Sequence, residues 1–181
     1  AGKYAVELVK AGRKPSELIT KEVLMNAIMF DMAVAGSTNA VLHILSYAYE
    51  LGIRLTLADF EKYAEEIPCI NAVVPSGPYT VVDFHYAGGV MNVMKMLESK
   101  LYTDVPGMYG NTWKDMLAMV TPQENKVIHS LERPLTKEPG LKILRGNLSP
   151  NGAIVRPTAV YEEVKYMKGK AKVFDLSLIH I

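Results

Sequence analysis

The chain has 181 residues, of which 49% are hydrophobic and 22% charged, and its formal net charge at pH 7 is +1. This composition is typical of a globular chain with room for one domain and part of a second. The balanced charge argues against a nucleic-acid partner, and the lack of a long apolar run or a signal-peptide pattern argues against a membrane. The single cysteine, Cys69, excludes an internal disulfide and a complete multi-thiolate metal site within the chain, and it fits a cytoplasmic protein.

Apolar residues at helical spacing dominate the first third of the chain. Residues 4–9 are typical of the end of a helix, which the Gly-Arg-Lys-Pro sequence at 12–15 interrupts. Thr20 can cap a helix that ends at Gly36, and a further helix is expected from about residue 39 to residue 51, before Gly52. Residues 53–55 are expected to be a short strand or an extended link.

Three capping boxes predict three more helices. In each, a threonine hydroxyl and the carboxylate three positions later bond reciprocally to backbone N–H groups of the first turn. The pairs are Thr56 with Asp59, Thr80 with Asp83, and Thr112 with Asp115. We expect a helix to start directly after each threonine, and two glycines at 88–89 to interrupt the second helix before it resumes over residues 90–97.

Strand-like apolar segments lie between and after these helices. Residues 69–74 are expected to form a buried strand, residues 127–131 and 141–144 are strand-like, and a Pro-Asn-Gly turn at 150–152 leads into residues 153–155. The alternation favours a layered α/β fold. A cluster of Pro, Thr, Lys, Glu and Gly at residues 134–140 marks the expected domain boundary.

The Gly36-Ser37-Thr38-Asn39 sequence between two apolar helical runs is the most informative feature. Ser, Thr and Asn cap helix N-termini, where the first backbone N–H groups lack partners. One interpretation is an interhelical turn with its own cap, which spacing alone favours. The other is a site for a carboxylate or phosphate, because a helix N-terminus offers free donors and positive partial charge.

Five segments, taken together, resemble the dihydroxy-acid dehydratase and phosphogluconate dehydratase family. They are residues 35–43 (AGSTNAVLH), 75–79 (PSGPY), 83–89 (DFHYAGG), 110–112 (GNT) and 146–153 (GNLSPNGA). Two positions depart from the family pattern: Ala35 stands for the first of two glycines, and Asn111 stands for a lysine. The resemblance implies that residues 1–134 are the later part of an N-terminal α/β domain and residues 141–175 the first strands of a β-barrel-like C-terminal domain.

The resemblance also implies a reaction. Family members remove water from a 2,3-dihydroxy carboxylate and release a 2-keto acid, with an iron–sulfur cluster, Mg²⁺ and a serine base, and the full-length enzyme is expected to be a homo-oligomer. None of those catalytic or metal-binding groups maps onto this chain, so no catalytic and no metal-binding residue is assigned, Cys69 included. Ser37, Thr38 and Asn39 are the predicted substrate-binding residues.

Other polar residues have ordinary interpretations. We expect His43 to be a core histidine, and the alternative is a side chain that faces the same end of the helix as Asn39, one turn before it. His85 is expected to lie on a different side of its helix from Asp83. His129 has no partner in its strand-like segment. Asp31 is a functional candidate because the end of a helix disfavours an anion, and the alternative is a solvated or salt-bridged carboxylate.

The last six residues, 176–181, match a translated sequencing adapter and are set aside as a scar. The chain is therefore expected to be an interior fragment that is inactive alone. Dihydroxy-acid dehydratase of branched-chain amino-acid synthesis is the preferred parent, and a sugar-acid (aldonate or phosphogluconate) dehydratase is the alternative. A non-catalytic α/β module that binds an anion or a partner is the hypothesis from another class.

Overall fold

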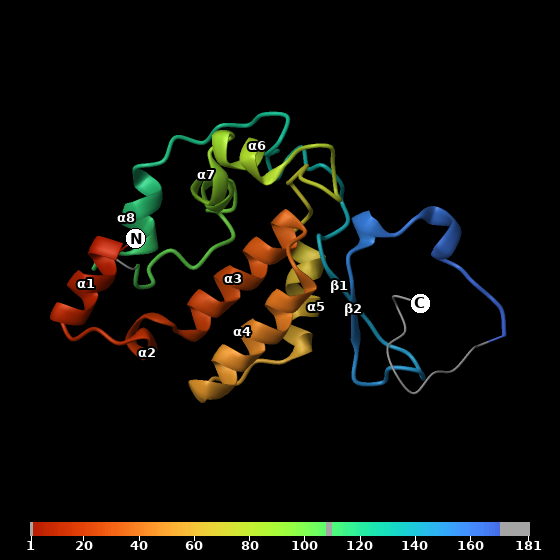
Figure 1. Ribbon diagram of the computed structural model, residues 1–181, viewed down its shortest axis with the longest axis horizontal. Coiled ribbons are helices and arrows are strands. Elements are labelled where there is room, and N and C mark those ends of the chain that lie inside the picture. The colour runs from red at the N-terminus through yellow and green to blue at the C-terminus, as the bar shows by residue number, and fades with distance from the viewer. Residues whose placement is uncertain (1, 108–109, 171–181) are drawn as a thin grey trace.

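The computed structural model describes residues 2–107 and 110–170. Its described helices and strands follow in the order α1 (Gly2–Lys10), α2 (Pro15–Leu18), α3 (Lys21–Val34), α4 (Thr38–Glu50), α5 (Leu57–Glu66), α6 (Val81–Tyr86), α7 (Gly89–Met96), α8 (Trp113–Ala118), β1 (Lys142–Leu144), β2 (Ala153–Val155), and the 3₁₀ turns η1 (Pro157–Ala159) and η2 (Glu162–Val164). Figure 1 shows α3, α4 and α5 lying together at the centre, with α6, α7 and α8 on one side and the β1–β2 hairpin beside α5.

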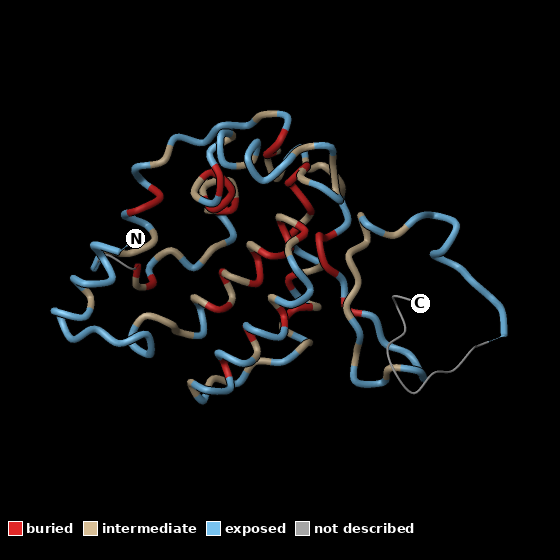
Figure 2. The backbone as a smooth tube through the Cα atoms, viewed as in Figure 1, coloured by how far each residue is buried: buried red, intermediate tan, exposed pale blue. Residues whose placement is uncertain are grey.

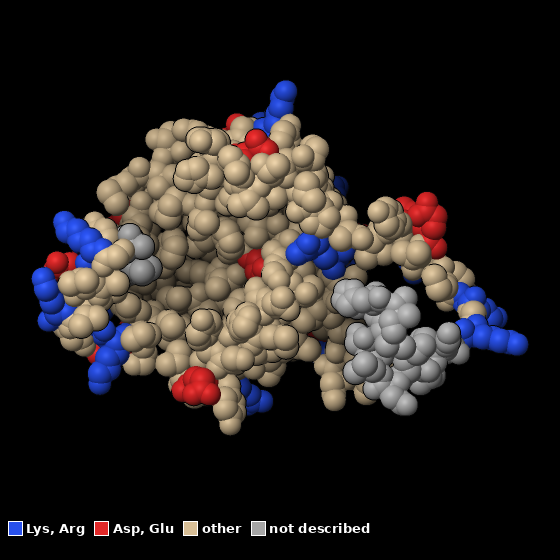
Figure 3. All heavy atoms as spheres, viewed as in Figure 1, with Lys and Arg blue, Asp and Glu red and all other residues tan. Residues whose placement is uncertain are grey.

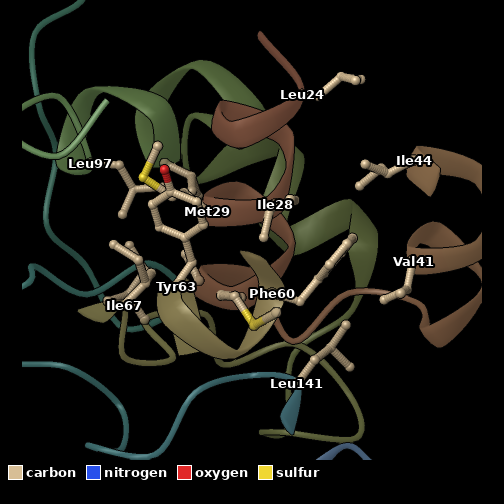
Figure 4. Packing of buried hydrophobic residues seen from close by; sticks show 14 of the residues in the cluster. Leu24, Ile28, Met29, Val41, Ile44, Phe60, Tyr63, Ile67, Leu97 and Leu141 are labelled. Atoms are coloured by element: carbon tan, nitrogen blue, oxygen red, sulfur yellow. The ribbon is translucent and has the colours of Figure 1, made fainter. Parts of the chain in front are cut away.

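Helix α3 is the centre of the core. It packs against α4, α5 and α7, and the side chains of Ile28, Met29 and Met32 are at most 1% exposed. Figure 4 shows Val41 and Ile44 of α4 and Phe60 of α5 among the residues of the same cluster. Because α3 has neighbours on several sides, it is apolar around most of its circumference, as a buried helix must be.

The expected helix starts are confirmed. Helices α5, α6 and α8 begin directly after Thr56, Thr80 and Thr112, and all three capping boxes are formed. Gly88 caps α7 with φ 100°, so the interruption between α6 and α7 falls at the two glycines. The short helix α2 was not predicted, and residues 53–55 form an extended link.

The prediction of a buried strand at residues 69–74 is wrong. The segment makes only isolated bridges, which join Cys69 to Thr136, Asn71 to Ile128 and Val73 to Tyr79. Its neighbours are irregular and change from residue to residue, so no continuous ladder forms. Residues 69–72 are nonetheless buried, and their backbone connects α3 to residues 127–138 through bonds to Ala33, Val127 and Glu138.

The predicted strands near residues 141–144 and 153–155 are confirmed as the antiparallel pair β1–β2, in which Ile143 lies opposite Ile154. The predicted Pro-Asn-Gly turn lies in the hairpin loop between them. Arg145 attaches the hairpin to α5 through a two-pronged ion pair with Glu61, at 2.7 and 3.2 Å. This mixture of helices with a small sheet agrees with the α/β class, and the β-barrel remains a prediction.

Burial falls off along the C-terminal part of the described chain. Figure 2 shows buried backbone in α3, α7 and the segments around them, and mostly exposed backbone after the hairpin. On the face shown in Figure 3, charged side chains lie mostly around the margin and the hollowed middle is largely uncharged. None of the described helices has the length and apolar character needed to cross a membrane.

Candidate functional site

The turn between α3 and α4 is built around the carboxylate of Asp31. Ala35 ends α3 in the left-handed conformation with φ 49°, and the N–H groups of Ala35 and Gly36 both donate to the Asp31 carbonyl. A Cβ atom on Gly36 would lie 1.9 Å from Oδ1 of Asp31. Glycine is therefore required at position 36 because the carboxylate fills the space that a side chain would need.

Ser37, Thr38 and Asn39 form the N-terminus of α4 and are all exposed. Ser37 is the N-cap, and its Oγ accepts a hydrogen bond from the Asn39 N–H at 3.2 Å. The side chains of Thr38 and Asn39 have no hydrogen-bond partner in the part of the chain that the structure describes. The structure thus contains the cap that spacing predicted, and it leaves two polar side chains of the turn open to solvent.

Asp31 is buried behind this turn. It is 6% exposed, and its Oδ2 has no hydrogen-bond partner among residues 2–107 and 110–170. Burial raises the pKa of its carboxyl to about 7, while the positive charge of Arg156 acts in the opposite direction. The alternative of a solvated carboxylate is wrong because the packing at the end of α3 excludes Asp31 from water.

Arg156 connects the segment after the β1–β2 hairpin to this turn. It follows β2 directly, and its Nη2 donates a hydrogen bond to the Gly36 carbonyl. Its Nε is buried and has no partner among the described residues. Its charge also lowers the pKa of the Cys69 thiol, which burial raises more strongly.

A second contact joins the same C-terminal segment to the Pro-Ser-Gly turn. Thr158 Oγ1 and Ser76 Oγ lie 2.7 Å apart. Ser37 and Ser76 therefore belong to two turns that are both held by residues 156–158. Sequence reasoning identified both turns but missed Arg156 and Thr158, whose only local signal is a polar pair around Pro157 after an apolar strand.

The histidines do not join this site. His43 is exposed, so the expectation of a core histidine is wrong: it lies on the solvent face of α4, between the buried Val41 and Ile44. His85 contacts the Tyr86 ring edge-on, and the nearby Asp83 carboxylate serves the α6 cap. His129 is half-buried, and its backbone N–H donates to the Ile70 carbonyl.

The described residues do not form a metal centre. No three His, Cys, Asp or Glu side chains among them are grouped so that they could hold a metal ion. The thiol of Cys69 is fully buried, and it donates to the Asn71 carbonyl at 3.6 Å. Burial raises its pKa, which disfavours the thiolate that an iron–sulfur cluster requires. The donor set therefore does not fit a cluster or Mg²⁺.

Family models match nearly the whole chain in two parts. Residues 1–116 match the dihydroxy-acid/6-phosphogluconate dehydratase N-terminal model, and residues 126–178 match the corresponding C-terminal model. The chain belongs to the dihydroxy-acid/6-phosphogluconate dehydratase family. This confirms the resemblance that the five short segments indicated, and the family is one of enzymes.

Individual members of the dihydroxy-acid/6-phosphogluconate dehydratase family are similar in sequence to this chain. The chain is 40% identical to dihydroxy-acid dehydratase of Methanosarcina barkeri, over 97% of this chain and 32% of that protein. The identity to dihydroxy-acid dehydratase of Clostridium novyi is also 40%, over 97% of this chain and 32% of that protein. L-arabinonate dehydratase of Rhizobium leguminosarum bv. trifolii is 39% identical, over 96% of this chain and 30% of that protein. The chain thus spans 30–32% of the length of these relatives.

Proposed function

We propose that this chain is part of a hydro-lyase that removes water from a 2,3-dihydroxy carboxylate to give a 2-keto acid. Its family is enzymatic, and the relatives named above are dehydratases. Within the chain we propose Ser37, Thr38 and Asn39 as residues that bind the substrate. Residues 1–134 would belong to the N-terminal α/β domain and residues 141–175 to a β-barrel-like C-terminal domain.

The observation that carries the site is the open N-terminus of α4. The helix has 13 residues, so its dipole is developed, and the exposed side chains of Thr38 and Asn39 have no partner among the described residues. A substrate carboxylate at this end would accept bonds from backbone N–H groups and from these side chains. Such contacts would bind and orient the substrate.

The first choice of substrate is the dihydroxy acid of branched-chain amino-acid synthesis, because several of the relatives are dihydroxy-acid dehydratases. A sugar acid is an equal alternative, since L-arabinonate dehydratase is as similar to this chain. Assays of the full-length enzyme on 2,3-dihydroxyisovalerate and L-arabinonate separate the two. A preference for L-arabinonate would overturn the first choice.

The remaining parts of the reaction are assigned to the rest of the enzyme. The family resemblance implies an iron–sulfur cluster and Mg²⁺, and the described residues fit neither. We therefore assign no proton transfer and no metal step to this chain. The full-length enzyme is proposed to be a cytoplasmic homo-oligomer that acts on a small hydroxy acid.

The test is alanine substitution of Ser37, Thr38 and Asn39 in the full-length enzyme, with stability and kinetics measured together. Loss of a cap costs about 1 kcal/mol of stability. Loss of a substrate contact instead lowers kcat/KM with little change in Tm. The matched control is Thr20→Ala, which removes the N-cap at the opposite end of α3, where Thr20 accepts from the Val23 N–H at 3.3 Å. Ser37→Ala alone removes a cap bond and should resemble Thr20→Ala in stability. If all three variants keep wild-type kcat/KM, the substrate site is wrong.

A further inference from the structure

The backbone of Arg156 is held on both sides. Val155, the residue before it, pairs with Lys142 in the hairpin, and Thr158, two residues after it, bonds to Ser76. Arg156 itself is extended, with φ −99° and ψ 102°, as residues before proline usually are. The start of its side chain is therefore fixed before the guanidinium makes any contact of its own.

The guanidinium lies against the one turn that the proposed function uses. Its Nη2 donates to the carbonyl of Gly36, the residue directly before the α4 N-cap Ser37. The turn has little other freedom on this side, because Gly36 rests against the Asp31 carboxylate. A displacement of Arg156 would therefore move Gly36 and, through it, the first N–H groups of α4.

Charge makes this contact stronger than a neutral hydrogen bond. The positive charge of Arg156 counteracts the rise in the pKa of the buried Asp31 carboxyl, and the Nε of Arg156 and the Oδ2 of Asp31 are both buried without a partner among the described residues. A hydrogen bond from a charged donor is stronger than one between two neutral groups. The hydrogen bond from Arg156 to the Gly36 carbonyl therefore links the segment after the hairpin firmly to the turn.

We propose that Arg156 is a positioning residue that fixes the Gly36–Ser37 turn, and so sets where the N-terminus of α4 presents its donors to the substrate. The functional half of this inference rests on the proposed substrate site. The structural half, that Arg156 orders residues 36–39, stands without it. The two halves are therefore tested by separate measurements.

The first measurement is amide hydrogen exchange in the 181-residue chain. Arg156→Met keeps the length of the side chain and removes its charge and donors, so exchange of the hydrogen-bonded amides of Gly36 and Asn39 should accelerate about tenfold or more. Arg156→Lys keeps the charge and one donor and should restore part of the protection. The control is Arg145→Met, which loosens the same hairpin at Glu61 without touching the turn. Equal exchange at Gly36 and Asn39 in all four proteins would overturn the proposal.

The second measurement is kinetic and uses the full-length enzyme. Arg156→Met should lower kcat/KM about tenfold or more, because small displacements of a binding group are expensive, and Arg156→Lys should recover part of the loss. Arg145→Met should keep the wild-type value. Suppose that Arg156→Met speeds exchange in the turn but keeps the wild-type kcat/KM. If the Ser37, Thr38 and Asn39 variants also keep the wild-type kcat/KM, the proposed substrate site is wrong. If only the Ser37, Thr38 or Asn39 variants lose activity, Arg156 is not a positioning residue.

Discussion

The carboxylate of Asp31 and the missing side chain of Gly36 are complementary. Oδ1 of Asp31 lies 1.9 Å, and its Cγ 3.0 Å, from the position that a Cβ atom on residue 36 would occupy. Asp31 is buried and cannot turn away into solvent, so the two residues constrain each other. This relationship links the end of the central helix α3 to the N-terminus of α4, where the proposed substrate contacts lie.

Gly36→Ala should destabilise the protein by about 2 kcal/mol, because the new methyl group must displace a buried carboxylate. Urea unfolding of the 181-residue chain measures the change. The matched control is Gly146→Ala in the exposed hairpin loop, where a Cβ would meet nothing within 4 Å and the cost should stay within about 0.5 kcal/mol. In an Asp31→Ala background the cost of Gly36→Ala should shrink, and an unchanged cost would show that the two side chains are not coupled.

Stability should fall as the pH rises through neutrality, and Asp31 should be a cause. The pKa of its carboxyl is about 7 in the folded chain, against an ordinary value of 3.8. The folded state therefore holds a proton that the unfolded state has released, and the advantage is lost as the pH rises towards and through 7. Between pH 5 and pH 8 the loss from this group should be on the order of 2 kcal/mol.

Asp31→Asn isolates that contribution, since asparagine keeps the shape of the carboxyl and does not ionise. The variant should gain stability relative to wild type at pH 8 and much less at pH 5. Urea unfolding at both pH values gives the comparison, and titration of every other group is common to the two proteins. Parallel stability–pH curves for variant and wild type would contradict the raised pKa.

Asn26 should be important for stability because its buried amide pairs with the backbone of Tyr102. Nδ2 of Asn26 donates to the Tyr102 carbonyl at 2.8 Å, and Oδ1 accepts from the Tyr102 N–H at 2.9 Å. Asn26→Ala removes both bonds and leaves two backbone groups without partners, at a cost of about 2 kcal/mol. A thermal melt measures the change, with exposed Asn147→Ala as the control within about 0.5 kcal/mol. Equal Tm values for both variants would contradict the role of this pair.

Local chemistry determined where the helices begin. Helices α5, α6 and α8 start directly after the predicted threonines because a capping box is complete within four consecutive residues. The hairpin was also predictable, since the turn residues and both strands lie close together in sequence. The family resemblance came from short contiguous segments, and both family models confirm it.

Tertiary structure alone determined whether residues 69–74 form a strand and which single residues are buried. Residues 69–74 have the apolar character of a strand, yet Thr136, Ile128 and Tyr79 come to them one at a time from different segments, so a ladder never forms. His43 has apolar neighbours in sequence, yet α4 turns it towards solvent. Whether a residue of an amphipathic element is buried depends on what packs against it, which the local pattern does not contain.

The candidate site divides in the same way. Sequence alone predicted a capped helix start within residues 37–39, because a cap is a relation between neighbours, and the structure assigns the cap to Ser37. Only the folded chain brings Arg156 onto the Gly36 carbonyl, 120 positions away, and buries Asp31 so that its carboxyl titrates near neutrality. Both depend on desolvation and on contacts between distant segments, and these energies exist only when the tertiary structure has excluded water from the turn.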